Sequence, residues 1–178
     1  MSKSKNFVFI VVHIMAWLIF VGLSIEAAAL IVNFIFSLCK PEAVQYLYQK
    51  LDLSELYARS KWAFFGMYGF ALIISSLKAV LFYVVIRLII KLDLAKPFNS
   101  FVAKKITQIS YYTLTIGLLS YIARQTANNL LHYGFDVGAL SQFWTDGQAF
   151  IFMAAIVYLI AAIFSKGVEL QNENDLTV

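Results

Sequence analysis

The stretch FVFIVVHIMAWLIFVGLSIEAAALIVNFIFSL, residues Phe7 to Leu38, decides the fold class. A helix that crosses the hydrocarbon core of a bilayer needs about 20 mainly apolar residues, at a rise near 1.5 Å per residue. The stretch is longer than that, and Glu26 is its only acidic or basic residue. It therefore predicts a membrane-spanning helix.

Three further apolar segments follow, and the four together predict an all-α membrane protein, a four-helix transmembrane bundle. The predicted spans are about 7–38, 64–90, 106–131 and 146–166. The rest of this single domain (1–178) is predicted as an outer loop at 39–63, a cytoplasmic loop at 91–105 and a cytoplasmic tail at 167–178. Composition supports this class: 61% of residues are hydrophobic and 13% charged, whereas soluble domains have about 45–50% and about 25%.

The positive charges predict an orientation. If the N-terminus is inside, eight Lys and Arg residues lie on the cytoplasmic side and four on the outer side. Because such a bias sets the topology of membrane proteins, we expect both termini in the cytoplasm. The positive charges are scattered and flank apolar runs, so they do not form the basic stripe of a nucleic-acid-binding protein. Direct nucleic acid binding is not expected.

The outer loop between the first two spans has the pattern of an amphipathic helix. Its apolar residues recur at i, i+3, i+4 and i+7, namely at Val44, Leu47, Tyr48 and Leu51. Ser54 can cap a second short turn. We expect one or two helices that lie on the membrane surface or cap the bundle.

Two other segments carry local signals. Asn99 or Ser100 can cap the helix that follows Pro97, because both side chains can accept hydrogen bonds from free backbone N–H groups. The segment from His132 to Gln148 is rich in turn residues, so we expect an outer connection made of turns.

Aromatic and small residues suggest where the helices meet lipid and one another. Trp62 and Trp144 are expected at the outer membrane interface, as members of an aromatic belt. Gly66 and Gly69 allow close helix contact, although no strict GxxxG motif is present.

Three charged residues fall within the predicted spans: Glu26, Lys78 and Arg124. An unpaired charge near mid-span costs about 2.5–3.5 kcal/mol on insertion scales. We therefore expect an intramembrane charge network in which Glu26 contacts Lys78, with Arg124 able to share the contact. In the alternative, Glu26 meets Arg124 while Lys78 extends toward the interface.

The charge network has two readings. In the structural one, a salt bridge holds the helices in register and keeps Glu26 ionised. In the functional one, Glu26 exchanges protons, which would make the chain a small proton-coupled transporter; small multidrug exporters also carry a glutamate in their first helix. His13 is expected as a buried histidine that bonds to a neighbouring helix.

The sequence contains no motif of a catalytic, cofactor-binding or metal site. HExxH, GxxxxGK[ST], GxSxG and GxGxxG are all missing, and Cys39 is the only cysteine. We therefore expect a protein that is not an enzyme and that needs no cofactor.

A second candidate region lies on the predicted cytoplasmic side, where the loop is basic and the tail acidic. In one reading the loop meets anionic lipid headgroups while the tail stays in water. In the other, loop and tail dock on each other and form one surface for a partner. The residues of this candidate partner surface are Lys91, Lys96, Pro97, Phe98, Lys104, Lys105, Glu169, Leu170, Glu173, Asp175, Leu176 and Val178.

Two of these segments, KPFNSFVAKKI (96–106) and GVELQNENDLTV (167–178), resemble one family. It is a bacterial domain-of-unknown-function family of small four-span membrane proteins, commonly encoded beside a Cro/CI-type helix-turn-helix regulator. The resemblance covers about Leu92 to Val178 best, and the first half matches only in hydropathy.

The resemblance implies a multi-pass protein of the bacterial cytoplasmic (inner) membrane, with no established activity. It further implies a membrane-bound regulatory or interaction partner of a cytoplasmic transcription regulator. Besides the transporter, an accessory subunit of a larger membrane complex stays open as an alternative. The expected partners are thus membrane lipid and either the helix-turn-helix regulator or that larger complex.

Overall fold

The computed structural model describes residues 3–40, 51, 53–93 and 97–176, and their side chains from 7 to 174. This part of the chain is helical and contains no strand. The elements are α1 (Lys3–Cys39), α2 (Ser54–Arg59), α3 (Lys61–Lys91), α4 (Ser100–His132), the 3₁₀-helix η2 (Gly138–Phe143) and α5 (Gly147–Leu176). An all-α fold is therefore confirmed for the described residues.

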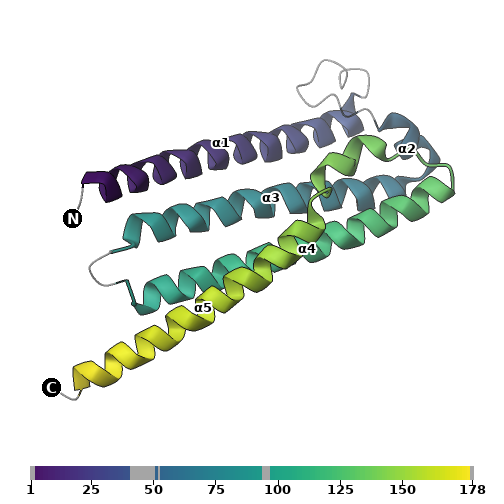
Figure 1. Cartoon of the computed structure of the whole chain (residues 1–178). Coiled ribbons are helices and arrows are strands. Elements are labelled where there is room, and N and C mark those ends of the chain that lie inside the picture. The colour runs from purple at the N-terminus through teal and green to yellow at the C-terminus, as the bar shows by residue number, and fades with distance from the viewer. Residues whose placement is uncertain (1–2, 41–50, 52, 94–96, 177–178) are drawn as a thin grey trace.

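The four long helices form a row in which each is antiparallel to the next along the chain (Figure 1). α1 packs on α3, α3 on α4, and α4 on α5, so that α1 and α5 lie at the two edges. This arrangement is more open than the closed four-helix bundle that the sequence suggests. One end of the row carries α2 and η2 and is called the cap end below. The other carries both chain termini and is called the terminal end.

Three of the helical stretches are long and apolar enough to cross a membrane: Phe7–Cys39, Lys61–Lys91 and Gly138–Asn174. α4 is as long as the others, about 50 Å at 1.5 Å per residue, but is not among them. The reason is its composition, since it carries Lys104, Lys105 and Arg124 as well as a row of Ser and Thr residues.

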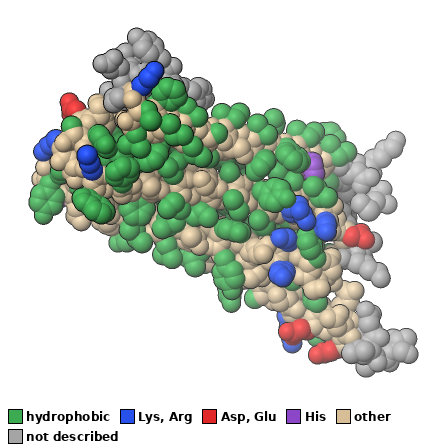
Figure 2. Space-filling view, turned by 180° about the vertical axis from the view of Figure 1, so that it is seen from behind, with side chains coloured by type: hydrophobic (Ala, Val, Ile, Leu, Met, Phe, Trp, Pro, Cys, Tyr) green, Lys and Arg blue, Asp and Glu red, His purple; other side chains and the backbone are tan. Residues whose placement is uncertain are grey.

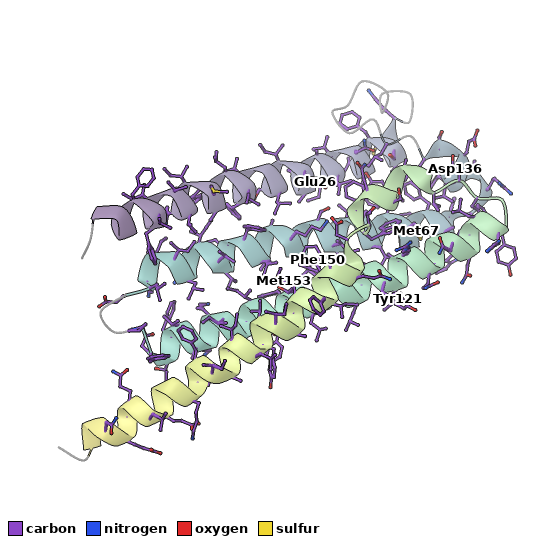
Figure 3. The ribbon with its side chains drawn as sticks, viewed as in Figure 1. Glu26, Met67, Tyr121, Asp136, Phe150 and Met153 are labelled. Atoms are coloured by element: carbon purple, nitrogen blue, oxygen red, sulfur yellow. The ribbon has the colours of Figure 1, made fainter. Side chains whose placement is uncertain are left out.

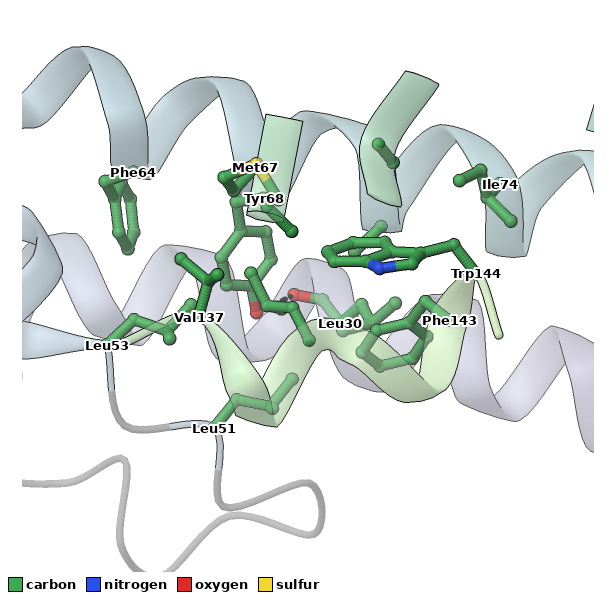
Figure 4. Close-up of a cluster of buried hydrophobic side chains, with 14 of the residues drawn as sticks. Leu30, Leu51, Leu53, Phe64, Met67, Tyr68, Ile74, Val137, Phe143 and Trp144 are labelled. Carbon is green, nitrogen blue, oxygen red and sulfur yellow. Dashed lines mark hydrogen bonds between the residues drawn. The ribbon is translucent and has the colours of Figure 1, made fainter. Parts of the chain in front are cut away.

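The largest core cluster joins the cap to the long helices (Figure 4). The cluster is covered from the α2 side by Leu51, Leu53 and Leu56. It is covered from the η2 side by Val137, Leu140 and Phe143. Trp144 is also buried in this cluster, which corrects the prediction that it lies in an aromatic belt. Trp62 is 90% exposed in the first turn of α3.

The connection between α4 and α5 returns into the row of helices. Gly147, the first residue of α5, lies against Ser120, where an added Cβ would come within 2.8 Å of the Ser120 Cβ. Ser120 is about 18 Å along α4 from its end at His132, at 1.5 Å per residue. The segment 133–146 covers this distance by packing η2 on α3. The segment is rich in turns, as predicted, and the structure adds that Val137, Leu140 and Phe143 in it are buried.

Several local predictions have definite outcomes. The Asn99 side chain accepts a hydrogen bond from Val102 N at 2.9 Å, so the cap of α4 is confirmed. A short second helix in the loop is confirmed as α2, while most of the predicted first one (41–50) lies outside the described residues. Gly66 and Gly69 would meet nothing within 4 Å of an added Cβ, so their predicted helix contact is wrong.

Candidate functional site

The predicted charge network does not form in the structure. Lys78 Nζ donates to the carbonyl oxygen of Phe143 at 3.1 Å and lies 5.8 Å from the centre of the Phe150 ring. Within the described residues, Glu26 makes no ion pair with Lys78 or Arg124. The reason is the path of residues 133–146, which places η2 against α3. The carbonyl at the end of η2 then accepts the hydrogen bond from Lys78.

Glu26 is half-buried on α1, and Figure 3 shows it on the cap half of that helix. It lies one helical turn before Leu30, whose carbonyl oxygen accepts a hydrogen bond from the Tyr68 hydroxyl at 3.1 Å. Its carboxylate is thus close to the α1–α3 contact without being enclosed by it.

A polar cluster that the sequence did not suggest lies inside the apolar core. The Tyr68 hydroxyl is 3.3 Å from Asn33 Oδ1, and both residues are fully buried. Asn33 Nδ2 and Ser75 Oγ are buried and have no hydrogen-bond partner among the described residues. Buried polar atoms of this kind normally bind a partner or a water molecule. The only sequence signal was the presence of Asn33 in an apolar run.

Arg124 lies on α4 beside the start of α5, where it lines two adjoining cavities of about 250 and 220 Å³. Asn128, Trp144 and Thr145 line both cavities as well. The guanidinium is exposed and has no hydrogen-bond or ion-pair partner in the described part of the chain. Arg124 is therefore available to a bound group. The sequence did not predict these cavities, because the residues after Gly138 that line them are brought to Arg124 only by the fold.

The predicted partner surface lies at the terminal end, and part of it does come together. The Phe98 ring packs on Phe164 with 5.3 Å between ring centres, and Gly167 lets it approach α5 closely. An added Cβ at Gly167 would lie 2.5 Å from the Phe98 ring. The α3–α4 connection thus docks on α5 through an apolar contact of Phe98.

Two cations of this end, Lys91 and Lys105, lie against one aromatic ring. Lys91 Nζ lies 4.9 Å and Lys105 Nζ 5.7 Å from the centre of the Phe101 ring. Lys105 also donates to Gln108 Oε1 at 2.7 Å, while Lys104 is exposed. In Figure 2 Lys and Arg side chains lie at this end and at the cap end, with a surface of apolar side chains between the two ends.

The predicted tail at 167–178 begins as a continuation of α5 rather than as a separate element. The helix runs to Leu176, with a Lys166–Glu169 ion pair of 2.6 Å one turn beyond the apolar segment. Leu170 is 51% exposed, so it does not anchor the tail on the loop. Lys96 and Val178 lie outside the described residues, as do the side chains of Asp175 and Leu176.

Two remaining points concern the partner of His13 and the residues that could hold a metal ion. His13 accepts a hydrogen bond from Trp17 Nε1 at 3.0 Å, so its partner is on its own helix rather than on a neighbour as predicted. No group of three His, Cys, Asp or Glu side chains is placed to hold a metal ion in the part of the chain that is described.

Comparison with known proteins gives one match. No curated protein and no solved structure matches the chain. Residues 46–178 match a family described as a protein of unknown function, DUF2975, so the match extends well before the region around Leu92 where the sequence resemblance begins. It includes α2, α3, α4, η2 and α5, and with them both the cap and the terminal end. The chain therefore belongs to the DUF2975 family, whose function is unknown.

Proposed function

We propose that this protein crosses the bacterial inner membrane four times and acts by protein contact, holding a cytoplasmic transcription regulator at its terminal end. The observation that carries this proposal is the helical extension of α5. Because Phe98 of the α3–α4 connection contacts Gly167, the residues from Val168 to Leu176 project beyond that connection. They form about two and a half turns, rich in polar residues, next to a basic helix end.

α4 is the fourth crossing in this proposal. It lies between two helices that are apolar enough to span, and its length matches theirs. Its Ser and Thr side chains at 110, 113 and 120 are buried against neighbouring helices, whereas Leu114, Leu118 and Ile122 are exposed. An apolar outer face with polar groups turned inward suits a helix surrounded by lipid.

The orientation follows from the charge bias. With the terminal end inside, the cytoplasmic side carries eight of the Lys and Arg residues and the outer side four. Lys91, Lys104 and Lys105 then lie at the cytoplasmic surface together with the α5 extension. A partner could contact both groups, since Phe98 joins them.

The class of partner rests on the family resemblance, which implies a helix-turn-helix regulator encoded next to the gene. Tethering it to the membrane would lower its free concentration, and any signal that changes helix packing could shift the population toward release. The regulator would make the DNA contacts, so this chain needs none.

Co-purification and bacterial two-hybrid assays with the adjacent regulator test the proposal. We expect deletion of residues 170–178, or reversal of charge at Lys91, Lys104 and Lys105 to Glu, to reduce binding at least tenfold. A control reverses Lys40 and Lys61, two exposed cations at the cap end, and should leave binding unchanged. Binding that survives both terminal-end changes would place the partner elsewhere and contradict the proposed surface.

A further inference from the structure

Cavities on one face of the α4–α5 pair line up along the two helices. Around Arg124, the α4 lining includes Ser120 and Asn128, and the α5 lining Gly147. Toward the terminal end, Ser110, Tyr111 and Leu114 of α4, with Ile151, Ala154 and Tyr158 of α5, line a further cavity of about 430 Å³. On α5 the named positions recur every three to four residues, so they share one face, while on α4 they form two sets, at 110–114 and at 120–128. The upper cavities around Arg124 and the lower cavity beside Ser110 are together called the α4–α5 groove.

The upper part offers hydrogen-bond donors. Arg124 contributes an exposed guanidinium without a partner among the described residues. Ser120 and Trp144 are 1% and 3% exposed, and their hydroxyl and indole N–H likewise have no partner in the described structure. No carboxylate lines either upper cavity. A guanidinium fork with further donors and no negative charge nearby favours an oxyanion such as a phosphate.

The lower part is apolar. The hydroxyl of Ser110 is used in a hydrogen bond to Ala154 O at 3.2 Å. Tyr111 and Tyr158 flank it, with 6.5 Å between their ring centres. Leu114, Leu118 and Leu159 are exposed on the same pair of helices, as expected for surface in contact with hydrocarbon.

We propose that the α4–α5 groove binds one anionic phospholipid, with its phosphate at Arg124 and an acyl chain in the lower part. The dimensions agree, because Ser110 and Ser120 are about 15 Å apart along α4, roughly half the thickness of a bilayer's hydrocarbon core. α5 begins at this level, so the upper part lies where headgroups lie when α5 crosses the membrane. A soluble oxyanion would use the upper part alone, whereas a phospholipid uses both.

Native mass spectrometry of the purified full-length protein tests this proposal. The protein is titrated with phosphatidylglycerol or phosphatidylcholine of equal chain length. For the wild type we expect one phosphatidylglycerol retained at least fivefold more strongly than phosphatidylcholine. Arg124→Gln should abolish the preference, and Arg124→Lys should restore part of it through the charge. Ala155→Phe, which fills the lower part, should weaken retention of both lipids.

Two control variants separate the groove from nonspecific effects. Lys104→Gln removes an equal charge at the terminal end, and Met153→Trp adds bulk to an exposed position of α5 outside the groove lining. Both should behave as the wild type. The proposal is overturned if the wild type shows no preference, or if Lys104→Gln removes it as fully as Arg124→Gln. It is also overturned if millimolar glycerol phosphate displaces the lipid while Ala155→Phe has no effect, since the site would then hold a soluble anion.

Discussion

Lys78 shows how one residue holds a charge within an apolar helix without an ionic partner. Its ammonium group donates to Phe143 O, the carbonyl of the last residue of η2. Carbonyls at the end of a helix lack intrahelical partners and carry partial negative charge, so a cation is favoured there. The same ammonium group lies 5.8 Å from the centre of the Phe150 ring, within range of a cation–π interaction. Glu26 is thereby left without the role of counter-ion that its position in the sequence suggests.

This arrangement predicts that Lys78 and Glu26 act independently. Lys78→Met should lower the free energy of unfolding by about 1–3 kcal/mol, because it leaves the carbonyl of Phe143 without its partner. Glu26→Gln should have a smaller effect, and the double variant should equal the sum within about 0.5 kcal/mol. Denaturant unfolding in detergent micelles measures all three. A double variant more stable than Lys78→Met alone would show that the two side chains form a salt bridge after all.

At the scale of the elements, the crossing of α4 and α5 depends on small residues. A Cβ added at Gly117 would lie 2.6 Å from Ile151 Cγ1 and 2.8 Å from the backbone nitrogen of the same residue. Gly147 meets Ser120 equally closely from the other helix. Close approach here places the first turn of α5 beside the middle of α4, and this placement creates the upper part of the α4–α5 groove.

We therefore predict opposite effects for alanine at two helical glycines. Gly117→Ala should lower the free energy of unfolding by about 1–3 kcal/mol, since the clash with the Ile151 backbone requires the helices to move apart. Gly66→Ala, where an added Cβ meets nothing within 4 Å, should raise stability by about 0.4–1 kcal/mol because the unfolded chain loses conformational freedom. Thermal unfolding followed by circular dichroism compares them. Equal effects of the two substitutions would argue against a tight α4–α5 crossing.

At the scale of the molecule, the cap end and the terminal end differ in kind. The cap end is a small apolar core covered by α2 and η2, while the terminal end has clustered cations and a projecting helix. The long helices between them expose apolar side chains along their lengths, above all on α1, which packs on α3 alone among the long helices. This distribution is the one expected of a protein with one end on each side of a membrane.

Cysteine labelling tests that topology. Cys39 is exposed at the cap end of α1, so an impermeant maleimide should label it in intact spheroplasts if the terminal end is cytoplasmic. On a Cys39→Ser background, Tyr133→Cys should also be labelled from outside, whereas Ser100→Cys should require permeabilised membranes. Positions 100 and 133 lie at the two ends of α4. Labelling of both from the same side would contradict a crossing by α4 and hence the four-span topology.

Features that depend on neighbouring residues were predictable. The Asn99 cap was predictable because the Asn99 side chain can accept a hydrogen bond from the backbone N–H three residues later. The apolar helices α1, α3 and α5 were predictable from their long apolar runs. Pairing across elements was not predictable. Trp144 was expected in an aromatic belt and Glu26 beside Lys78, because the sequence does not say that residues 133–146 fold back over α3.

The sequence by itself determined that this protein is all-α and has helices long and apolar enough to span a membrane, because burial in hydrocarbon demands consecutive apolar residues whose backbone bonds close within each helix. The sequence also indicated the family, through the residues near the C-terminus. Only the tertiary structure decided which groups meet. The returning connection 133–146 gives Lys78 a carbonyl, buries Trp144 and leaves Arg124 facing a cavity, since hydrogen bonds and cavities depend on distances that residues far apart in the chain acquire only on packing.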